Sequence, residues 1–564
     1  MIIGGGTSGL TVAQRLAENP MVSVAVIEGG SFYEFGNGNI SQIPAYDTRY
    51  SSPSPTTIQP LVDWGIVTVP QTQLDGREIH YTQGKCLGGS SGRNYLAYQR
   101  GSRGSYQRWA DMVGDQSYTF NNTLHYFQKS PEFTPPNYAK RGTQSSILYD
   151  PLAFSSTGGP LQISYSNFYQ PISPYFKQAF VKLGIKNIAG FNSGSLLGFS
   201  EFTLSIDPQA GTRSSSETSF LQEAISSSTL QVYQQTLAKR ILFDDNKTAT
   251  GVRVVTAGTE YTLSANKEVI LAAGAFRSPQ MLMVSGIGPS TTLEQFGIPI
   301  QSDLRGVGQG MWDQPFYSVT YRVNTTTNSQ LLVNPAFELQ ATEDYLNDQT
   351  GPLGSAGGNW VAWEKLPRSL RNQLSNATIS DLSQFPADWP ELELLPLAAT
   401  TATTSDNGNY ASVSIAVLAT TSRGNVTINS TDTTDNPLVS PNWLLTETDQ
   451  ELAVQGFKRA RQIANATGIT LGPEFSPGPQ TQTDAQILDY IRQVLAPIHH
   501  ASTTCAMGGA NNSNAVVDSK GRVYGVQALR IVDSSIFPLL PPGHPQATVY
   551  MLAEKLADDI IRGN

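Results

Sequence analysis

The sequence has little of what staples a chain together or anchors it in a membrane. Its 564 residues include only two cysteines, Cys86 and Cys505, which is too few for a disulfide scaffold. Each cysteine lies inside a motif described below, and this favours free thiols over a single bridge. No apolar run approaches the roughly 20 residues of a membrane-spanning helix, so we expect no membrane span.

Charge and histidine are also scarce. Charged residues make up 14% of the chain and the net charge is −9, which argues against a nucleic acid or an anionic membrane as partner. There are five histidines, and three of them, His499, His500 and His544, fall near the C-terminus. Histidine is the side chain whose charge changes near neutral pH. Proton chemistry is therefore one interpretation of this cluster, and hydrogen-bonded core residues are the other.

What the chain does contain is typical of a large globular protein. A length of 564 residues exceeds one ordinary core and predicts two or more domains. Hydrophobic residues at 39% exclude a disordered chain, and 50 glycines with 34 prolines indicate many loops. We find no internal repeat and no low-complexity block.

Asn-X-Ser/Thr sequons favour the secretory pathway. They occur at Asn39, Asn121, Asn246, Asn324, Asn376, Asn425, Asn429, Asn465 and Asn511. The chain shows no signal peptide and begins "MIIGGG", with little room for a first strand. We therefore expect a leader upstream of Met1 and a secreted or vacuolar protein, with the cytoplasm as the alternative.

The N-terminal segment "IIGGGTSGLTVAQRLAENPMVSVAVIEGG" combines an apolar strand, a glycine turn, a helix and a second strand. Gly4, Gly6 and Gly9 fit G-x-G-x-x-G, in which glycines allow a tight turn, close approach to a pyrophosphate and close helix–strand packing. The free N–H groups of the helix N-terminus attract phosphate. Glu28 ends the second strand, where a carboxylate accepts hydrogen bonds from an adenosine ribose. This context predicts a dinucleotide site without choosing between FAD and NAD.

Further motifs follow along the chain. They are "GKCLGGSSGRNYLAYQRG" (84–101), "GTRSSSETSFL" (211–221), "GAFRSPQMLMVSGIG" (274–288), "GVGQGMWDQP" (306–315) and "LRIVDSSIFPLLPPGHPQATVYMLAEKLADDI" (529–560). Together with the N-terminal turn, these segments strongly resemble the glucose–methanol–choline (GMC) family of FAD-dependent oxidoreductases. The resemblance covers essentially the whole chain in order, and its last segments look most like the filamentous-fungal branch of the family.

The resemblance implies an α/β fold with two domains. A Rossmann-like FAD-binding domain would be assembled from residues 1–155, 206–312 and 498–564. A substrate-binding domain with a mostly antiparallel sheet would comprise 156–205 and 313–497. Segment 409–428 has the strand–turn–strand pattern that such a sheet requires.

The family's flavin contacts can be carried over residue by residue. The resemblance places Gly4, Gly6, Thr7, Ser8 and Gly9 on the pyrophosphate, Glu28 on the ribose, Gly84, Leu87, Ser91 and Asn94 along the flavin, Ala238 on the adenine, Asp533 on the linker hydroxyls, and Pro545 and Gln546 at the ring. Some members bind FAD covalently through a histidine in the 84–101 segment. This chain has "SSGRN" there, so we expect non-covalent FAD and no metal site.

The resemblance also assigns the histidines. The family pattern H-x-x-G-T-C-x-M-G aligns His500 of "HASTTCAMG" with the catalytic base that faces the flavin, although Thr503 stands where the family has glycine. His544 occupies the second catalytic position, before a helical segment that begins near Pro545. Its helix N-terminus would stabilise negative charge on the reduced flavin. We expect His499 to point away from the site and to have a packing or supporting role.

These roles predict oxidation of a primary or secondary alcohol to an aldehyde or ketone, with His500 as base and oxygen or another acceptor reoxidising the flavin. One alternative is a non-redox lyase or cyclase, since plant hydroxynitrile lyases and fungal versicolorin B synthase share this fold. The other is a flavin-binding protein without activity. Aromatic residues scattered through the substrate domain suit an aromatic or secondary-metabolite alcohol, but core packing explains them equally well. The sequence leaves substrate and oligomeric state open.

Overall fold

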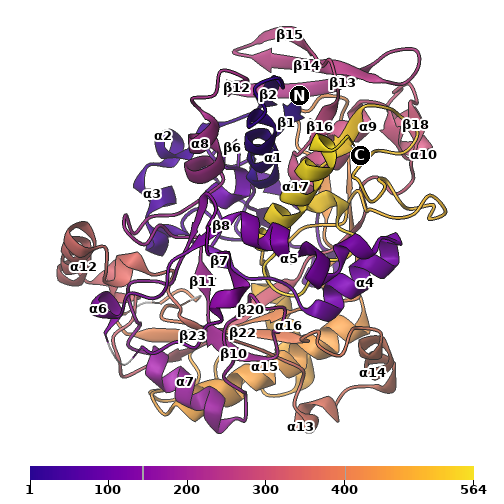
Figure 1. The fold of residues 1–564 in the computed structure, drawn as a ribbon. Coiled ribbons are helices and arrows are strands. Elements are labelled where there is room, and N and C mark those ends of the chain that lie inside the picture. Colours follow the sequence, from indigo (N-terminus) through magenta and orange to yellow (C-terminus); the bar gives the residue numbers. More distant parts are fainter. Residues whose placement is uncertain (143–144, 401, 405, 564) are drawn as a thin grey trace.

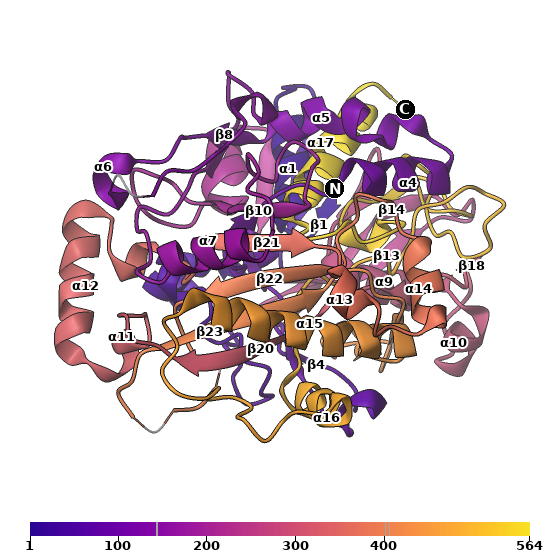
Figure 2. The same cartoon turned by 90° about the horizontal axis from the view of Figure 1, so that it is seen from below.

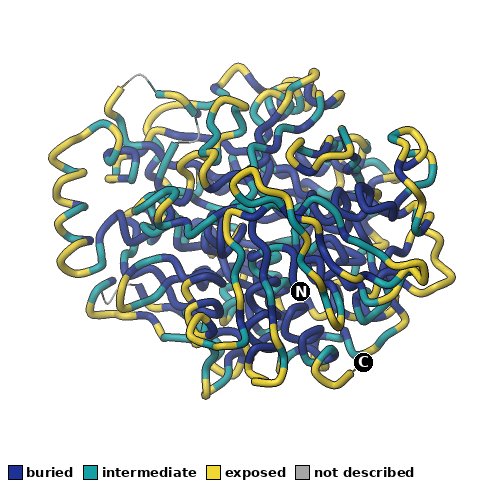
Figure 3. Tube along the Cα trace, turned by 90° about the horizontal axis from the view of Figure 1, so that it is seen from above, coloured by how far each residue is buried: buried dark blue, intermediate teal, exposed yellow. Residues whose placement is uncertain are grey.

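Two sheets, one parallel and one antiparallel, organise the molecule (Figure 1). A computed structural model of the chain describes residues 1–142, 145–400, 402–404 and 406–563. The predicted α/β class, with a Rossmann-like parallel sheet beside an antiparallel sheet, is confirmed. Buried residues fill the interior around both sheets, and exposed residues follow the outer loops (Figure 3).

The parallel sheet has five short, apolar strands. Their order is β12 (Leu230–Tyr233), β2 (Val24–Ile27), β1 (Ile2–Ile3), β16 (Val269–Leu271) and β27 (Leu529–Ile531). Ile2 pairs with Val26 on one side and Ile270 on the other. Strands of a parallel sheet are covered on both faces, which is why these segments are nearly continuous apolar runs.

Helices that follow the strands bring their N-termini to one edge of this sheet. The helix α1 (Thr7–Ala17) follows β1, α9 (Gly274–Val284) follows β16, and α17 (Gln546–Ile561) lies after β27. Helices α1 and α17 pack side by side (Figure 1). A bidentate bond of 2.8 and 2.7 Å from the Arg15 guanidinium to the Glu554 carboxylate joins them in the interior.

The antiparallel sheet has six strands. Their order is β10 (Gly198–Glu201), β21 (Trp360–Glu364), β22 (Leu392–Leu397), β23 (Tyr410–Val417), β20 (Pro315–Arg322) and β26 (Ala496–Pro497). The long helix α15 (Glu447–Thr467) crosses its outer face (Figure 2). A methyl group at Gly456 of α15 would lie 2.9 Å from the Tyr317 hydroxyl, so glycine allows the close approach of helix and sheet.

Each strand of the parallel sheet lies in the segments predicted for FAD binding, and each strand of the antiparallel sheet lies in those predicted for substrate. The domain boundaries themselves stay a prediction. Within the described residues, no helix is both long and apolar enough to cross a membrane. Cys86 and Cys505 are both free and buried.

Candidate active site

A cavity is lined by residues from the parallel-sheet edge, the 84–95 segment and the segment that follows β26. Of the predicted cofactor-binding residues, its wall contains Gly4, Gly6, Thr7, Ser8, Glu28, Gly84, Ser91, Asn94, Ala238, Asp533, Pro545 and Gln546. Both predicted catalytic histidines, His500 and His544, line the same cavity. The structure therefore brings together residues more than 500 positions apart in the chain.

Two predicted flavin contacts do not line the cavity, Gly9 and Leu87. A methyl group on Gly9 would stand 2.0 Å from the Gly4 carbonyl oxygen, so this glycine allows α1 to pack against its own turn. Leu87, in β6 (Cys86–Leu87), is fully buried, and its Cδ2 lies 3.0 Å from where a Gly5 side chain would begin. Both residues shape the cradle from behind.

The cradle consists of backbone rather than side chains. Gly4 has φ of +107°, and a methyl group there would lie 2.4 Å from the Ala272 carbonyl oxygen. Gly89 approaches so closely that its added methyl would lie 2.7 Å from Gly6 Cα. Gly6, the N-cap of α1, makes no side-chain capping bond, so the N–H groups of the first turn remain for a phosphate.

The Glu28 carboxylate stands where the ribose was predicted to bind. Its two oxygens accept hydrogen bonds from the backbone of Gly5 (2.9 Å) and Gly30 (2.8 Å). Burial raises the pKa of Glu28 to about 7, although both backbone bonds lower it. Each carboxylate oxygen can accept a further bond. The glycine cradle, the open helix N-terminus and this acid together fit the adenosine and pyrophosphate of FAD.

Other predicted cofactor residues have partners within the protein. The Asn94 amide donates to Gln546 Oε1 (2.7 Å) and accepts from the Arg213 guanidinium (2.5 Å). The Ala238 carbonyl accepts a 2.7 Å bond from Thr433. These bonds fix the wall of the cavity at the two ends assigned to the flavin and the adenine.

Asp533 reaches the cavity wall with its carboxylate turned to its neighbours. Its oxygens accept from the Gly274 amide (2.9 Å), the Ser278 hydroxyl (2.6 Å) and the Ser535 amide (2.8 Å). This acid therefore joins the start of α9 to the loop after β27. Its assignment to the linker hydroxyls of FAD stays a prediction.

His500 is held at both its backbone and its ring. Its amide donates to Asp313 Oδ1 (3.0 Å), and Nδ1 lies 2.8 Å from Gln314 Oε1. An amide oxygen can only accept, so the ring proton is on Nδ1 and Nε2 is an unprotonated acceptor. Burial, followed by the nearby His544 and His499, lowers the pKa of His500 well below its ordinary value. The ring is therefore a neutral base at physiological pH.

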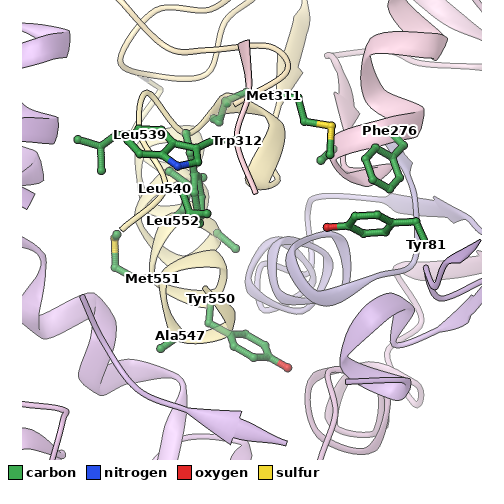
Figure 4. Close-up of a cluster of buried hydrophobic side chains, with 14 of the residues drawn as sticks. Tyr81, Phe276, Met311, Trp312, Leu539, Leu540, Ala547, Tyr550, Met551 and Leu552 are labelled. Atoms are coloured by element: carbon green, nitrogen blue, oxygen red, sulfur yellow. The ribbon is translucent and has the colours of Figure 1, made fainter. Parts of the chain in front are cut away.

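Through Tyr81, the Asp313 carboxylate also fixes the backbone of Ala501, the residue after His500. Asp313 Oδ2 accepts a 2.9 Å bond from the Tyr81 hydroxyl, which in turn accepts a 3.0 Å bond from the Ala501 amide. Tyr81 packs edge to face against Phe276, with ring centroids 4.8 Å apart (Figure 4). The backbone on both sides of the His500 ring is thus anchored to the core.

His544 faces His500 with ring centroids 4.8 Å apart. Its Nε2 lies 2.9 Å from Glu393 Oε1, and its ring meets Phe202 edge to face at 5.3 Å. Glu393 is an almost fully buried residue of β22. The N-terminus of α17 follows directly, with no side-chain capping bond at Pro545. His544 is therefore oriented by the antiparallel sheet and stands beside a partial positive charge.

His499 also lines the cavity, contrary to the expectation that it points elsewhere. Its backbone is left-handed, with φ of 66°, and this turn brings two successive imidazoles to one cavity. The ring packs edge to face on Tyr81 at 5.1 Å. The packing on Tyr81 agrees with a supporting role, whereas the place in the cavity wall allows a contact with a ligand. The supporting role of His499 therefore stays a prediction.

Three side chains that organise the histidines have no role in the sequence prediction. Asp313 and Gln314 lie inside the quoted segment "GVGQGMWDQP". Neither residue of this motif was assigned a role from the sequence. Glu393 is one of two glutamates in "PELELLPL", and nothing in that pattern distinguishes it. The role of Glu393 follows only from its contact with His544, 151 positions away in the chain.

Comparison with known proteins identifies the fold. The GMC oxidoreductase family model for the N-terminal region matches residues 1–316, and the one for the C-terminal region matches residues 420–553. The chain belongs to the GMC oxidoreductase family. The predicted family and fold are confirmed, and FAD as cofactor agrees with this family and with its solved neighbours.

Fungal proteins are similar over the whole chain. Patulin synthase of Aspergillus clavatus is 50% identical over 572 residues, covering 99% of this chain and 91% of the relative. Versicolorin B synthase of Aspergillus parasiticus is 44% identical over 568 residues, covering 100% and 88%. Among solved structures, an FAD-dependent oxidoreductase from Chaetomium thermophilum superposes with a TM-score of 0.88 at 29% identity, covering 100% and 99%.

Proposed function

We propose that this GMC oxidoreductase binds FAD non-covalently and oxidises a primary or secondary alcohol, aromatic or of secondary-metabolite type, to an aldehyde or ketone. The observation that carries the proposal is the His500 ring. It is buried, neutral and fixed through Nδ1, and it lines the same cavity as the FAD cradle. A general base needs this combination of position and unprotonated state.

In this proposal His500 Nε2 accepts the proton of the substrate hydroxyl. Gln314 keeps the ring proton on Nδ1, so Nε2 stays available throughout binding. With its Nε2–H donated to the Glu393 carboxylate, His544 turns Nδ1 toward the same substrate oxygen. A neutral ring accepts at Nδ1, so only a His544 ring protonated on both nitrogens donates to that oxygen and holds it opposite His500.

FAD, when bound, supplies the acceptor for the hydride that leaves the carbinol carbon. The protein's share is orientation, desolvation and proton transfer. The uncapped N-terminus of α17 places a partial positive charge beside His544. Oxygen or another electron acceptor completes the cycle, and the alcohol is the small-molecule partner.

Anaerobic mixing of the holoprotein with benzylic, furanic and polyketide alcohols tests this function. Flavin absorbance should bleach with a substrate, and His500→Ala should slow bleaching by about 10²–10⁴-fold while FAD stays bound. His544→Ala should cost less, and His125→Ala, an exposed histidine, is the matched control. Acid should release free FAD, because residues 84–101 contain no histidine.

A second candidate is a non-redox synthase or cyclase, favoured by 44% identity to versicolorin B synthase over the whole chain. Such an enzyme would use the same two histidines for proton transfer alone. It would convert its substrate while the flavin stays oxidised. Product formation without bleaching in the anaerobic experiment would therefore select this candidate over alcohol oxidation.

We also propose a secreted or vacuolar glycoprotein. All sequon asparagines except Asn425 are exposed in the structure, and Asn425 is half-buried in β24 (Gly424–Thr427). Endoglycosidase treatment of the native protein should therefore lower its mass. An unchanged mass would contradict this location and favour the cytoplasm.

A further inference from the structure

A buried arginine stands in the cavity wall on the same side as His499. Arg93 is 6% exposed, and its Nη2 makes only long bonds, 3.3 and 3.4 Å, to the carbonyl oxygens of Arg49 and Tyr50. Its Nε is buried without a hydrogen-bond partner among the described residues. A buried guanidinium with unused donors is costly unless an acceptor satisfies it.

His499 offers a second unused group beside this arginine. Its Nδ1 is buried without a hydrogen-bond partner among the described residues. Burial, with the nearby His80, lowers the pKa of His499 to about 3, so the ring is neutral and can both donate and accept. The His499 ring lies 6.0 Å from that of Tyr95, whose hydroxyl donates to Ser51 Oγ at 3.0 Å.

Among the described residues no ion pair to Arg93 is found, although the buried Asp47, which does not line the cavity, acts electrostatically on the neighbouring Tyr95. The acids that line the cavity, Glu28 and Asp533, bond to the cradle backbone and to Ser278. Asp63 lies behind the wall, where its Oδ2 is 3.2 Å from His80 Nε2. Arg93 and His499 line the same cavity as His500.

We propose that Arg93 and His499 form a subsite for an acidic oxygen of the substrate, such as a carboxylate or phenolate, while its alcohol lies between His500 and His544. The subsite rests on the proposed function, and it restricts the substrate class to alcohols that also carry an anionic oxygen. The left-handed turn at His499 places the subsite one residue from the base. Substrate recognition and proton abstraction thus share one short segment.

The test compares 4-(hydroxymethyl)benzoate with its methyl ester, in which a methyl group on the carboxyl oxygen removes the negative charge. Anaerobic stopped-flow gives the flavin reduction rate divided by the substrate dissociation constant for each. The wild-type holoprotein should prefer the carboxylate. Arg93→Met should lower its value about 10- to 100-fold, as expected for a lost charge-assisted hydrogen bond, and change the ester less than about threefold.

Matched variants separate recognition from support. Arg93→Lys should recover part of the preference, because the charge remains. His499→Phe keeps the aromatic packing on Tyr81 and should lower the carboxylate value about fivefold. Arg368→Met, at an exposed position, should change neither substrate.

The inference is overturned if the Arg93 and His499 variants lose equal activity on both substrates, or if their flavin spectrum or FAD content changes. These residues would then support the loop or the flavin rather than bind the substrate. If none of the tested alcohols reduces the flavin of the wild-type protein, only the proposed function is refuted. Benzoate titration of the oxidised holoprotein then tests the subsite directly. The dissociation constant must rise at least tenfold in Arg93→Met, and an unchanged constant rejects the subsite.

Discussion

The two ends of the cavity are built on different principles. The FAD cradle presents glycine backbone and a helix N-terminus, and its first unit is local in the chain, with Glu28 bonded to Gly5 23 positions away. Ala272 and Gly89 then approach this unit from distant segments. The histidine site presents buried side chains from distant segments. His500 contacts Gln314 across 186 positions, and His544 contacts Glu393 across 151.

This contrast separates binding the cofactor from using it. The glycines of the cradle act through the space that they leave free, since a side chain at Gly4 or Gly9 would overlap the backbone. The residues around the histidines act through hydrogen bonds that set a tautomer and an orientation. Changes in the cradle should therefore remove the flavin, whereas changes around the histidines should leave a yellow protein with altered rates.

The largest effect is expected in the cradle. Gly9→Val would press a branched side chain onto the Gly4 carbonyl oxygen, which a single methyl already approaches to 2.0 Å. The strain exceeds the ~1–3 kcal/mol typical of overpacking, so we expect insoluble or colourless protein, measured as flavin absorbance per polypeptide. Gly509→Ala, where a methyl meets nothing within 4 Å, should keep full colour. Full flavin content in Gly9→Val would show that the turn adapts.

The local part of the cradle is the part that sequence reasoning can reach. Gly4, Gly6 and Glu28 lie in one strand–turn–helix–strand unit whose spacing is set by local geometry. Even there, local pattern could not tell residues that face the cavity from those behind it. Gly9 was predicted at the pyrophosphate and Leu87 along the flavin, and neither lines the cavity in the structure.

A smaller effect is expected where the ring of His500 is held. Gln314→Leu removes the acceptor for Nδ1–H and lets the other tautomer form, which blocks Nε2 as a base. One neutral hydrogen bond contributes about 0.5–1.5 kcal/mol, so anaerobic flavin reduction should slow up to about tenfold. FAD content should stay at the wild-type level. Flavin loss in this variant would contradict the separation between the two ends of the cavity.

The pH profile sharpens the same point. A base must be neutral to act, and burial lowers the pKa of His500 well below its ordinary value. Flavin reduction should therefore stay level from about pH 6 to 8, where an exposed histidine of pKa ~6.5 would titrate, and fall only in more acidic buffer. Gln314→Glu places a carboxylate beside the ring and should move this acidic fall to higher pH. A wild-type rate that rises through pH 6.5 would contradict a buried base.

The histidine pair was assigned from the sequence, but its surroundings were not. The family pattern located His500 and His544. The roles of Glu393 and Gln314 appear only when the antiparallel sheet brings β22, the start of β20 and the segment after β26 together. The sequence also misdirected His499, because alternation of side chains assumes ordinary extended backbone. A left-handed φ of 66° breaks that alternation.

The smallest effect is expected at Thr503, where this chain departs from the family glycine. Its φ of 69° is left-handed, a conformation that costs a non-glycine residue about 1–3 kcal/mol, while its hydroxyl donates to the Gly310 carbonyl. Thr503→Gly relieves the strain and loses that bond, so the free energy of unfolding should change by less than about 1 kcal/mol. Thr503→Val keeps the strain and loses the bond, so its thermal midpoint should be the lowest of the three. Equal midpoints for the valine variant and wild type would show that the hydroxyl contributes nothing to holding this segment beneath the histidines.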